Sequence, residues 1–247
     1  MPKLLCITAH PDDEAGAFGG PLALYGDRGV QTHLVCLTSG QAATHRGTSK
    51  SGEELAKLRR AELQESCRIL RISRWELLAY PDGGLDRTDF YQVAGELTRR
   101  VREIRPDILV TFGPEGAVTG HPDHSMASLF ATMAYHWAGR RDRYREQLER
   151  GLPTHRTPKL YYGTASFTLP DRQPISPAPG TAIVDITGFV ETKIAAFRSH
   201  RTQSPLFERF ESAIRGRNEE WFHLAALTTP SLAHPENDLF DGIPDGI

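Results

Sequence analysis

The stretch KLLCITAHPDDE, residues 3–14, decides the fold. Its first seven residues are mostly apolar, which is typical of a strand in a parallel sheet that is buried on both faces. His10, Pro11 and Asp12 follow at once. Proline favours the first turn of a helix and keeps the residue before it out of the helical conformation. The stretch therefore predicts a buried strand, then a turn rich in ionisable side chains, then a helix.

The same tripeptide, His-Pro-Asp, occurs again at residues 121–123, after a second apolar run at 108–112 and a glycine-rich loop at 113–120. From 10 His, 17 Pro and 14 Asp in 247 residues, chance predicts about 0.04 such tripeptides in the whole chain. A related His-Pro-Glu at 234–236 has no strand before it, and we interpret it as a turn. Two copies behind two predicted strands indicate a shared site.

Strand-like and helix-like segments alternate along the first 140 residues. The predicted strands are 3–9, 30–38, 75–80 and 108–112, and the predicted helices are 12–25, 53–70, 90–104 and 122–139. This alternation predicts an α/β fold with a parallel, doubly wound sheet. Residues 39–52 are rich in Ser, Thr and Gly, which indicates a mobile loop between the second strand and the second helix.

The pattern weakens in the second half of the chain. We expect a charged helical stretch at 140–150, strands at 159–163 and 181–186, and helices at 189–200 and 207–217. No internal repeat or linker is visible, so we assign residues 1–227 to a single domain. Residues 228–247 contain no Lys or Arg and are rich in Pro and Asp, which predicts a C-terminal tail that is surface-bound or disordered.

Composition narrows the classes of protein that fit. A net charge of −2 gives no reason to expect nucleic acid or an anionic membrane as partner. Apolar runs fall short of the roughly 20 residues of a membrane span, and the amino terminus leads straight into a strand. The cysteines, Cys6, Cys36 and Cys67, are odd in number and lack metal-type spacing. We interpret them as reduced residues of a cytoplasmic protein.

Ionisable side chains of the two motifs have the spacing of metal ligands. Doubly wound sheets bind ligands beyond the carboxyl ends of their strands, so strands 3–9 and 108–112 would bring the motifs together if they are neighbours. His121 and His124 share one side of a helix start, and His10 and Asp13 repeat that spacing. Two imidazoles and one carboxylate leave an open coordination position, which suits catalytic Zn²⁺ or Fe²⁺.

Each of these residues has an ordinary structural explanation when it is taken singly. Asp12, Asp13 and Glu14 are acids at a helix start, where the helix dipole favours negative charge. A lone histidine is more often a capping or core residue than a ligand. The duplication of the motif and its placement favour the metal site over these explanations.

Residues 9–14 (AHPDDE) and 120–124 (GHPDH) resemble the two signatures of the PIG-L/LmbE-like N-acetylglucosaminyl deacetylases. Further segments are similar to motifs of that family in the same order, namely 58–63 (LRRAEL), 80–85 (YPDGGL), 193–203 and 220–222 (EWF). Together they cover nearly residues 1–225. The resemblance implies a Rossmann-like fold with helices on both faces of the sheet, bound Zn²⁺ and removal of acetyl groups from amino-sugar conjugates.

The resemblance also implies a role for each site residue. The implied zinc ligands are His10, Asp13 and His124. Asp12 would be the general base, and His121 would stabilise the tetrahedral intermediate. Asp123 would orient His121 and, as a nearby negative charge, raise its pKa so that it stays protonated. The residues implied to contact sugar hydroxyls are Arg59 and Asp82.

The expected substrate is a small N-acetylglucosamine conjugate, such as those of bacillithiol- or mycothiol-type thiol biosynthesis. Free N-acetylglucosamine, chitooligosaccharides, other amides and assembly into a homo-oligomer stay open. A non-haem Fe(II) oxygenase shares the two-His-one-carboxylate set, but we expect such an enzyme to be a β-sandwich. A non-catalytic sugar- or metal-binding module would not need a base such as Asp12.

Overall fold

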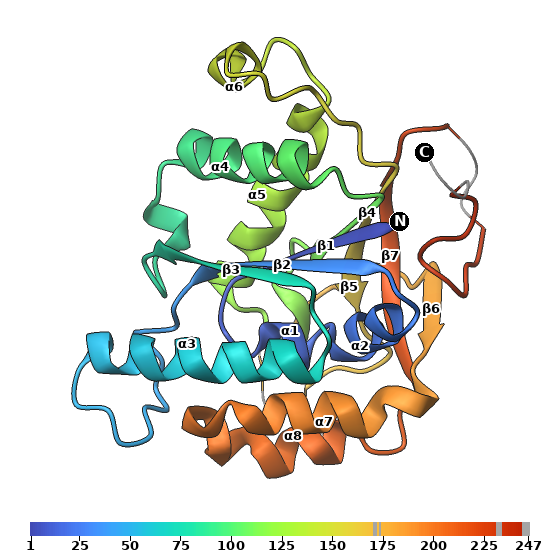
Figure 1. Cartoon of the computed structure of the whole chain (residues 1–247). Helices are drawn as coiled ribbons and strands as arrows, with labels where there is room; N and C mark the ends of the chain where they lie inside the picture. Colours follow the sequence, from blue (N-terminus) through green and yellow to red (C-terminus); the bar gives the residue numbers. More distant parts are fainter. Residues whose placement is uncertain (170–171, 173, 231–233, 244–247) are drawn as a thin grey trace.

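The computed structural model describes residues 1–169, 172, 174–230 and 234–243, and in these residues seven strands form one sheet (Figure 1). The order across the sheet is β3-β2-β1-β4-β5-β7-β6. The strands are β1 (Lys3–Thr8), β2 (Gln31–Thr38), β3 (Arg74–Tyr80), β4 (Ile108–Phe112), β5 (Lys159–Thr164), β6 (Ala182–Asp185) and β7 (Glu219–Leu227). The strand β1, which starts the deciding stretch, is therefore central.

Strand directions confirm the predicted doubly wound sheet. β1 pairs in parallel with β2 on one side, where Leu5 opposes His33, and with β4 on the other, where Leu5 opposes Leu109. β3 and β5 extend the parallel sheet outward, and β7 and β6 add an antiparallel edge. Because the chain winds in opposite directions from β1 and β4, a crevice opens between the carboxyl ends of these two strands.

Helices cover both faces of the sheet (Figure 1). The first face carries α4 (Phe90–Ile104) and α5 (Pro122–Ala138). The other face carries α1 (Asp13–Gly16), α2 (Gly19–Asp27), α3 (Gly52–Ile69) and α7 (Val190–Ser199), with α8 (Phe207–Ile214) packed on α7. The apolar side chains of β1, β2 and β4 are almost fully buried between these layers, which explains why these strands read as continuous apolar runs.

Most predicted elements are confirmed to within one or two residues, but the helix predicted at 12–25 is divided into α1 and α2. The backbone N–H of Gly20 donates to Glu220 Oε1 at 3.0 Å, so α2 begins there with a carboxylate at its amino end. A Cβ atom at Gly20 would lie 2.6 Å from Ile186 and 2.7 Å from Glu220. The division lets the glycine approach β7, a contact that helical periodicity does not reveal.

The charged stretch 140–150 is helical only at α6 (Arg145–Glu149). Much of the segment before α6 is held by a buried arginine of α4. The Arg102 side chain is 1% exposed and donates to the backbone carbonyls of residues 137, 138, 140, 143 and 144. Residues 139–144, between α5 and α6, are thus arranged around this guanidinium and are not helical, so the charge pattern over-predicted the helix here.

Described residues of the C-terminal tail pack against the sheet. Glu236 accepts a hydrogen bond from Lys159 Nζ at 2.7 Å and one from Tyr161. The Leu239 side chain is fully buried, and Asp238 accepts a hydrogen bond from Tyr25 at 2.9 Å. Residues 231–233 and 244–247, also within the predicted tail, lie outside the described residues.

The three cysteines are free and buried in the hydrophobic core, as predicted for reduced core residues. Among the described residues, every helix is too short or too polar to cross a bilayer.

Candidate active site

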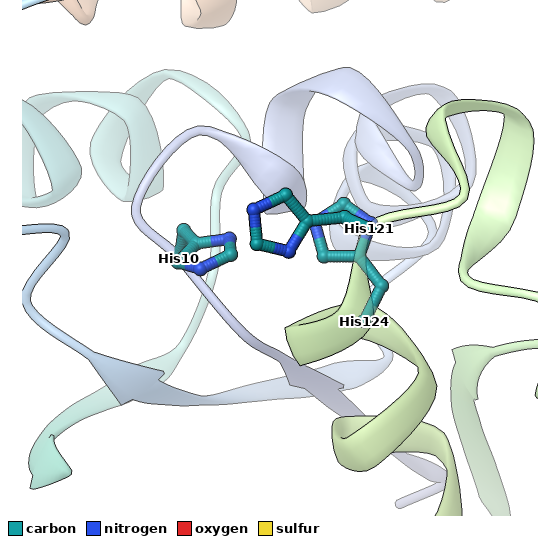
Figure 2. Close-up of side chains that lie close together, drawn as sticks. All are labelled: His10, His121 and His124. Carbon is teal, nitrogen blue, oxygen red and sulfur yellow. The ribbon is translucent and has the colours of Figure 1, made fainter. Parts of the chain in front are cut away.

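The topology brings the two His-Pro-Asp motifs to the crevice between β1 and β4. His10 lies just beyond β1, and His121 is the N-cap of α5, with His124 in its first turn. Figure 2 shows the three imidazoles converging from these two segments. Their ring centroids are 4.8 Å apart for His10 and His121, 5.4 Å for His10 and His124, and 5.1 Å for His121 and His124.

Asp13 joins the motifs. Its Oδ1 lies 3.1 Å from His124 Nε2, and its Oδ2 lies 3.6 Å from His10 Nδ1. Oδ2 also accepts the backbone N–H groups of Ala9 and His10, at 3.2 and 2.7 Å. Burial alone would raise the pKa of Asp13, but His124 and His10 beside it hold the pKa well below its usual value. The side chain is therefore a carboxylate directed at both histidines.

The outer nitrogens of the two histidines are held by other side chains. His10 Nε2 lies 3.1 Å from both Asp82 Oδ1 and Asp123 Oδ2, and carboxylates only accept, so Nε2 carries the proton. Burial alone would lower the pKa of His10, but the hydrogen bonds to these carboxylates raise it. His124 Nδ1 lies 3.5 Å from Thr119 Oγ1. The nitrogens left to face Asp13 are Nδ1 of His10 and Nε2 of His124.

This donor set fits a divalent metal ion. Four-coordinate zinc has bonds of about 2 Å, which put neighbouring donor atoms roughly 3.3 Å apart. The separations of 3.1 Å from Asp13 Oδ1 to His124 and of 3.6 Å from Asp13 Oδ2 to His10 are close to that spacing, although each involves a different oxygen of the carboxylate. Ligand atoms of His10, His121 and His124 also lie within 4.8 Å of one another, so His121 is near enough to be an alternative ligand. Histidine ligands oriented by carboxylates are usual in metal sites.

The structure corrects the prediction for Asp123. Its carboxylate contacts His10 and accepts the backbone N–H groups of Gly83 and Leu85, at 2.7 and 3.1 Å, so it does not pair with His121. Instead, the backbone N–H of Asp123 donates to His121 Nδ1 at 3.1 Å. Burial lowers the pKa of His121, and the nearby His10 and His124 lower it further; Asp123 raises it, as predicted, but the net shift is downward. Sequence spacing could not distinguish the carboxylate of Asp123 from its amide.

Asp12 lies beside this group with an uncommon backbone. Its φ of 110° is in the region that favours glycine, at a cost of about 1–3 kcal/mol. Its Oδ2 accepts a hydrogen bond from Arg59 Nη2 at 2.8 Å. Burial and the neighbouring Asp13 raise the pKa of Asp12, against the opposing charge of Arg59. A raised pKa suits a group that takes up and releases a proton near neutral pH.

Arg59 and Asp82, the predicted sugar contacts, line the cavity but already have protein partners. Arg59 is 3% exposed and also donates to the carbonyls of Pro11 and Gly40. Asp82 lies against His10 and accepts the backbone N–H of Ala42 at 2.7 Å. Contact with a sugar therefore stays a prediction for both, and the geometry adds a role in fixing the site.

A cavity of about 610 Å³ opens over the cluster. Its floor includes His10, Asp12, Asp13, His121 and His124. One wall is the loop 42–45, within the predicted loop 39–52, and another comes from η4 (Arg201–Leu206) and α8. This volume is in the range of small-molecule sites, which is usually 300–1,000 Å³.

Sequence reasoning missed a buried polar group behind Asp12. Glu14, Ser66 and His200 are fully buried, and Ser66 and His200 both form hydrogen bonds with Glu14 Oε1. The sequence alone indicates an acid in the first turn of a helix for Glu14, and for His200 an ordinary structural histidine within the motif at 193–203. Their proximity depends on the packing of α7 against both α1 and α3, which no local sequence signal encodes.

Comparison with known proteins identifies the family. The model of the PIG-L family, described as GlcNAc-PI de-N-acetylase, matches residues 5–135, more than half of the chain. The chain belongs to the PIG-L family. The matched region contains both His-Pro-Asp motifs and the strands β1 and β4 that position them.

Several relatives that match this PIG-L protein over most of its length are named deacetylases. A 1D-myo-inositol 2-acetamido-2-deoxy-alpha-D-glucopyranoside deacetylase of Catenulispora acidiphila is 30% identical, covering 98% of this chain and 97% of the relative. A diacetylchitobiose deacetylase of Thermococcus kodakarensis is 32% identical over 86% of this chain and 75% of its own. The solved N,N'-diacetylchitobiose deacetylase of Pyrococcus horikoshii superposes with a TM-score of 0.77 at 28% identity, covering 90% of this chain and 83% of that one.

Proposed function

We propose that the protein is a zinc-dependent hydrolase that removes the acetyl group from an N-acetylglucosamine conjugate. The single observation that carries the proposal is the convergence of His10, Asp13 and His124, with Asp12 beside them, on the floor of one cavity. The names of the relatives support the reaction class. An Fe(II) oxygenase was expected on a β-sandwich, and the doubly wound sheet speaks against it.

The residues that would hold the metal ion are His10, through Nδ1, Asp13, through its carboxylate, and His124, through Nε2. A divalent ion held by such a set supplies Lewis-acid polarisation of a carbonyl and lowers the pKa of water toward 7. Asp82 and Asp123 accept hydrogen bonds from the Nε2–H group of His10 and so leave Nδ1 without a proton. Thr119 and the stacked ring of Phe112, 4.1 Å from that of His124, support the second imidazole.

Asp12 is the general base of the proposal. Its carboxylate takes a proton from the attacking water and passes it to the amine nitrogen as the C–N bond breaks. Its raised pKa makes both transfers feasible, and Arg59 fixes one of its oxygens. An amine leaves poorly as an anion, so protonation of this nitrogen is required for cleavage.

His121 is the donor to the carbonyl oxygen as negative charge develops there. Because Nδ1 accepts the Asp123 N–H, a neutral His121 carries its proton at Nε2 and can donate from that atom. The role therefore does not require an imidazolium ion. Donors of this kind usually contribute about 3–4 kcal/mol to the transition state.

An amine-release assay tests the proposal. Candidate substrates are N-acetylglucosaminyl malate, N-acetylglucosaminyl inositol, diacetylchitobiose and free N-acetylglucosamine. The zinc-loaded protein is expected to release acetate and a primary amine in equal amounts from at least one of the conjugates or diacetylchitobiose. Absence of acetate with all four, from protein shown to bind one zinc ion, would refute the proposal. Parallel loading with Fe²⁺ identifies the more active metal.

A further inference from the structure

We propose that Glu14 is a positioning residue that aims the Asp12 carboxylate by binding the backbone N–H of Asp12. The inference rests on the proposed function in one respect, since Asp12 is the base of that proposal. Glu14 does not line the active-site cavity, and neither do its partners Ser66 and His200. It therefore acts through Asp12 and does not touch the substrate.

The contacts of Glu14 divide between its two oxygens. Oε2 accepts the backbone N–H of Asp12 at 3.0 Å. Oε1 accepts His200 Nε2 at 2.7 Å and the hydroxyl of Ser66. All three side chains have no measurable exposure. The group thus links α1 to α3, which carries Ser66, and to the end of α7, where His200 lies.

Asp12 needs such support because its backbone conformation is unfavourable. A non-glycine residue with φ of 110° persists only when surrounding contacts hold it. Asp12 precedes the first residue of α1, so its N–H lies outside the hydrogen bonds of that helix. Glu14 accepts a hydrogen bond from this N–H, and Arg59 donates one to the Asp12 carboxylate at 2.8 Å. Asp12 is thereby fixed at its backbone and at its side chain.

A purely structural role does not explain the cluster as well. A fully buried carboxylate is unfavourable unless it is paired, and an apolar side chain would fill the same space without that cost. Ser66 and His200 satisfy Oε1, but Oε2 is directed at Asp12. Glu14 Oε2 therefore holds the backbone of Asp12, the residue proposed as the base.

Glu14→Met and Glu14→Gln test the inference together. Methionine keeps the volume but offers no oxygen, whereas the glutamine oxygen can accept the Asp12 N–H while its NH₂ group donates to a neutral His200. We expect kcat to fall about 100-fold in Glu14→Met, as for a misplaced reactive group, with KM and zinc affinity unchanged. Glu14→Gln should recover most of the loss. Glu65→Ala, an exposed glutamate on α3, is the control that keeps full activity. Equal losses in both Glu14 variants, or no loss in Glu14→Met, would overturn the inference.

A double-mutant cycle and an NMR measurement separate this role from general stability. If Glu14 acts through Asp12, Glu14→Met should cost no further activity in an Asp12→Asn background, and an additive loss would contradict the inference. In the metal-free protein, the amide proton of Asp12 should move upfield in Glu14→Met and stay near its original shift in Glu14→Gln; an unchanged shift in Glu14→Met would also contradict it. Full activity of Asp12→Asn alone would refute Asp12 as base, while the NMR result would still test the contact.

Discussion

At the scale of single residues, the site is organised by which nitrogen of each histidine is left free. The carboxylates of Asp82 and Asp123 accept hydrogen bonds from Nε2 of His10. The backbone N–H of Asp123 donates a hydrogen bond to Nδ1 of His121. These hydrogen bonds leave Nδ1 of His10 toward Asp13 and Nε2 of His121 for a donor role. The two motifs share one sequence, but other residues bind different ring nitrogens of their first histidines, and the functions proposed for His10 and His121 differ accordingly.

Asp12→Asn is expected to separate zinc binding from turnover. Asparagine keeps the size of the side chain and an oxygen for Arg59, but it cannot take up a proton. Because general bases usually contribute 10²–10⁴-fold, kcat should fall by about that factor while zinc affinity stays unchanged. Acetate release and chelator competition measure the two quantities. Normal turnover would show that another group is the base.

His121→Ala and His124→Ala should differ in zinc affinity. His124 faces Asp13 directly at 3.1 Å, whereas Nδ1 of His121 is already occupied by the Asp123 N–H. We therefore expect His124→Ala to lose both zinc and activity. His121→Ala should keep zinc but lose roughly 10²–10³-fold in kcat, as for loss of an oxyanion donor. Titration with a zinc indicator distinguishes them, and equal zinc loss would make His121 a ligand.

Gly40→Ala tests whether Arg59 must stay in place. Gly40 has φ of 65°, and a Cβ atom there would overlap the Arg59 guanidinium, which binds Asp12. Gly29→Ala is the matched control, because Gly29 has φ of 81° but nothing within 4 Å of the added atom. Both variants should lose stability of about 1 kcal/mol or more from backbone strain. Only Gly40→Ala should also lower kcat, and equal kcat in the two variants would refute the coupling of Arg59 to Asp12.

At the scale of elements, the sequence predicts what depends on periodicity and misses what depends on packing between elements. β1, β4 and α5 follow from apolar runs and from proline, and they bring the two His-Pro-Asp motifs together as predicted. The break between α1 and α2 depends on Gly20 meeting Glu220, 200 residues away. The pairing of Asp123 with His10 likewise spans 113 residues. Local sequence patterns allow several partners for such a residue, and only long-range contacts determine which partner it binds.

Arg102→Met should lower the stability of the end of α5 and of the segment before α6. The side chain binds five backbone carbonyls and Gln147 Oε1, and methionine would leave these acceptors without it. We expect the free energy of unfolding to fall by roughly 3 kcal/mol or more. Arg99→Met, which removes an exposed pair with Glu103 on the same helix, should cost less than about 1 kcal/mol. Urea unfolding measures both, and similar losses would show that the carbonyl contacts contribute little.

At the scale of the whole molecule, the order β2-β1-β4-β5 brings together the residues of the proposed metal site from segments that are distant in sequence. The first motif belongs to the β1–α1 connection and the second to the β4–α5 connection, and only the sheet holds them together. The site is therefore absent from the unfolded chain, in which the motifs are separated by about a hundred residues. Metal affinity and global stability must be linked.

Zinc should accordingly raise the stability of the entire domain. At a free zinc concentration 1,000 times the Kd, the free energy of unfolding is expected to rise by about 4 kcal/mol. For a domain of this size that corresponds to a Tm increase of roughly 10 °C, which calorimetry with and without a chelator would detect. Asp12→Asn should keep the increase, because Asp12 is not a ligand, and His124→Ala should lose it. A zinc-dependent increase of the same size in His124→Ala would mean that the stabilising ion binds elsewhere, and the two motifs would then not share a metal.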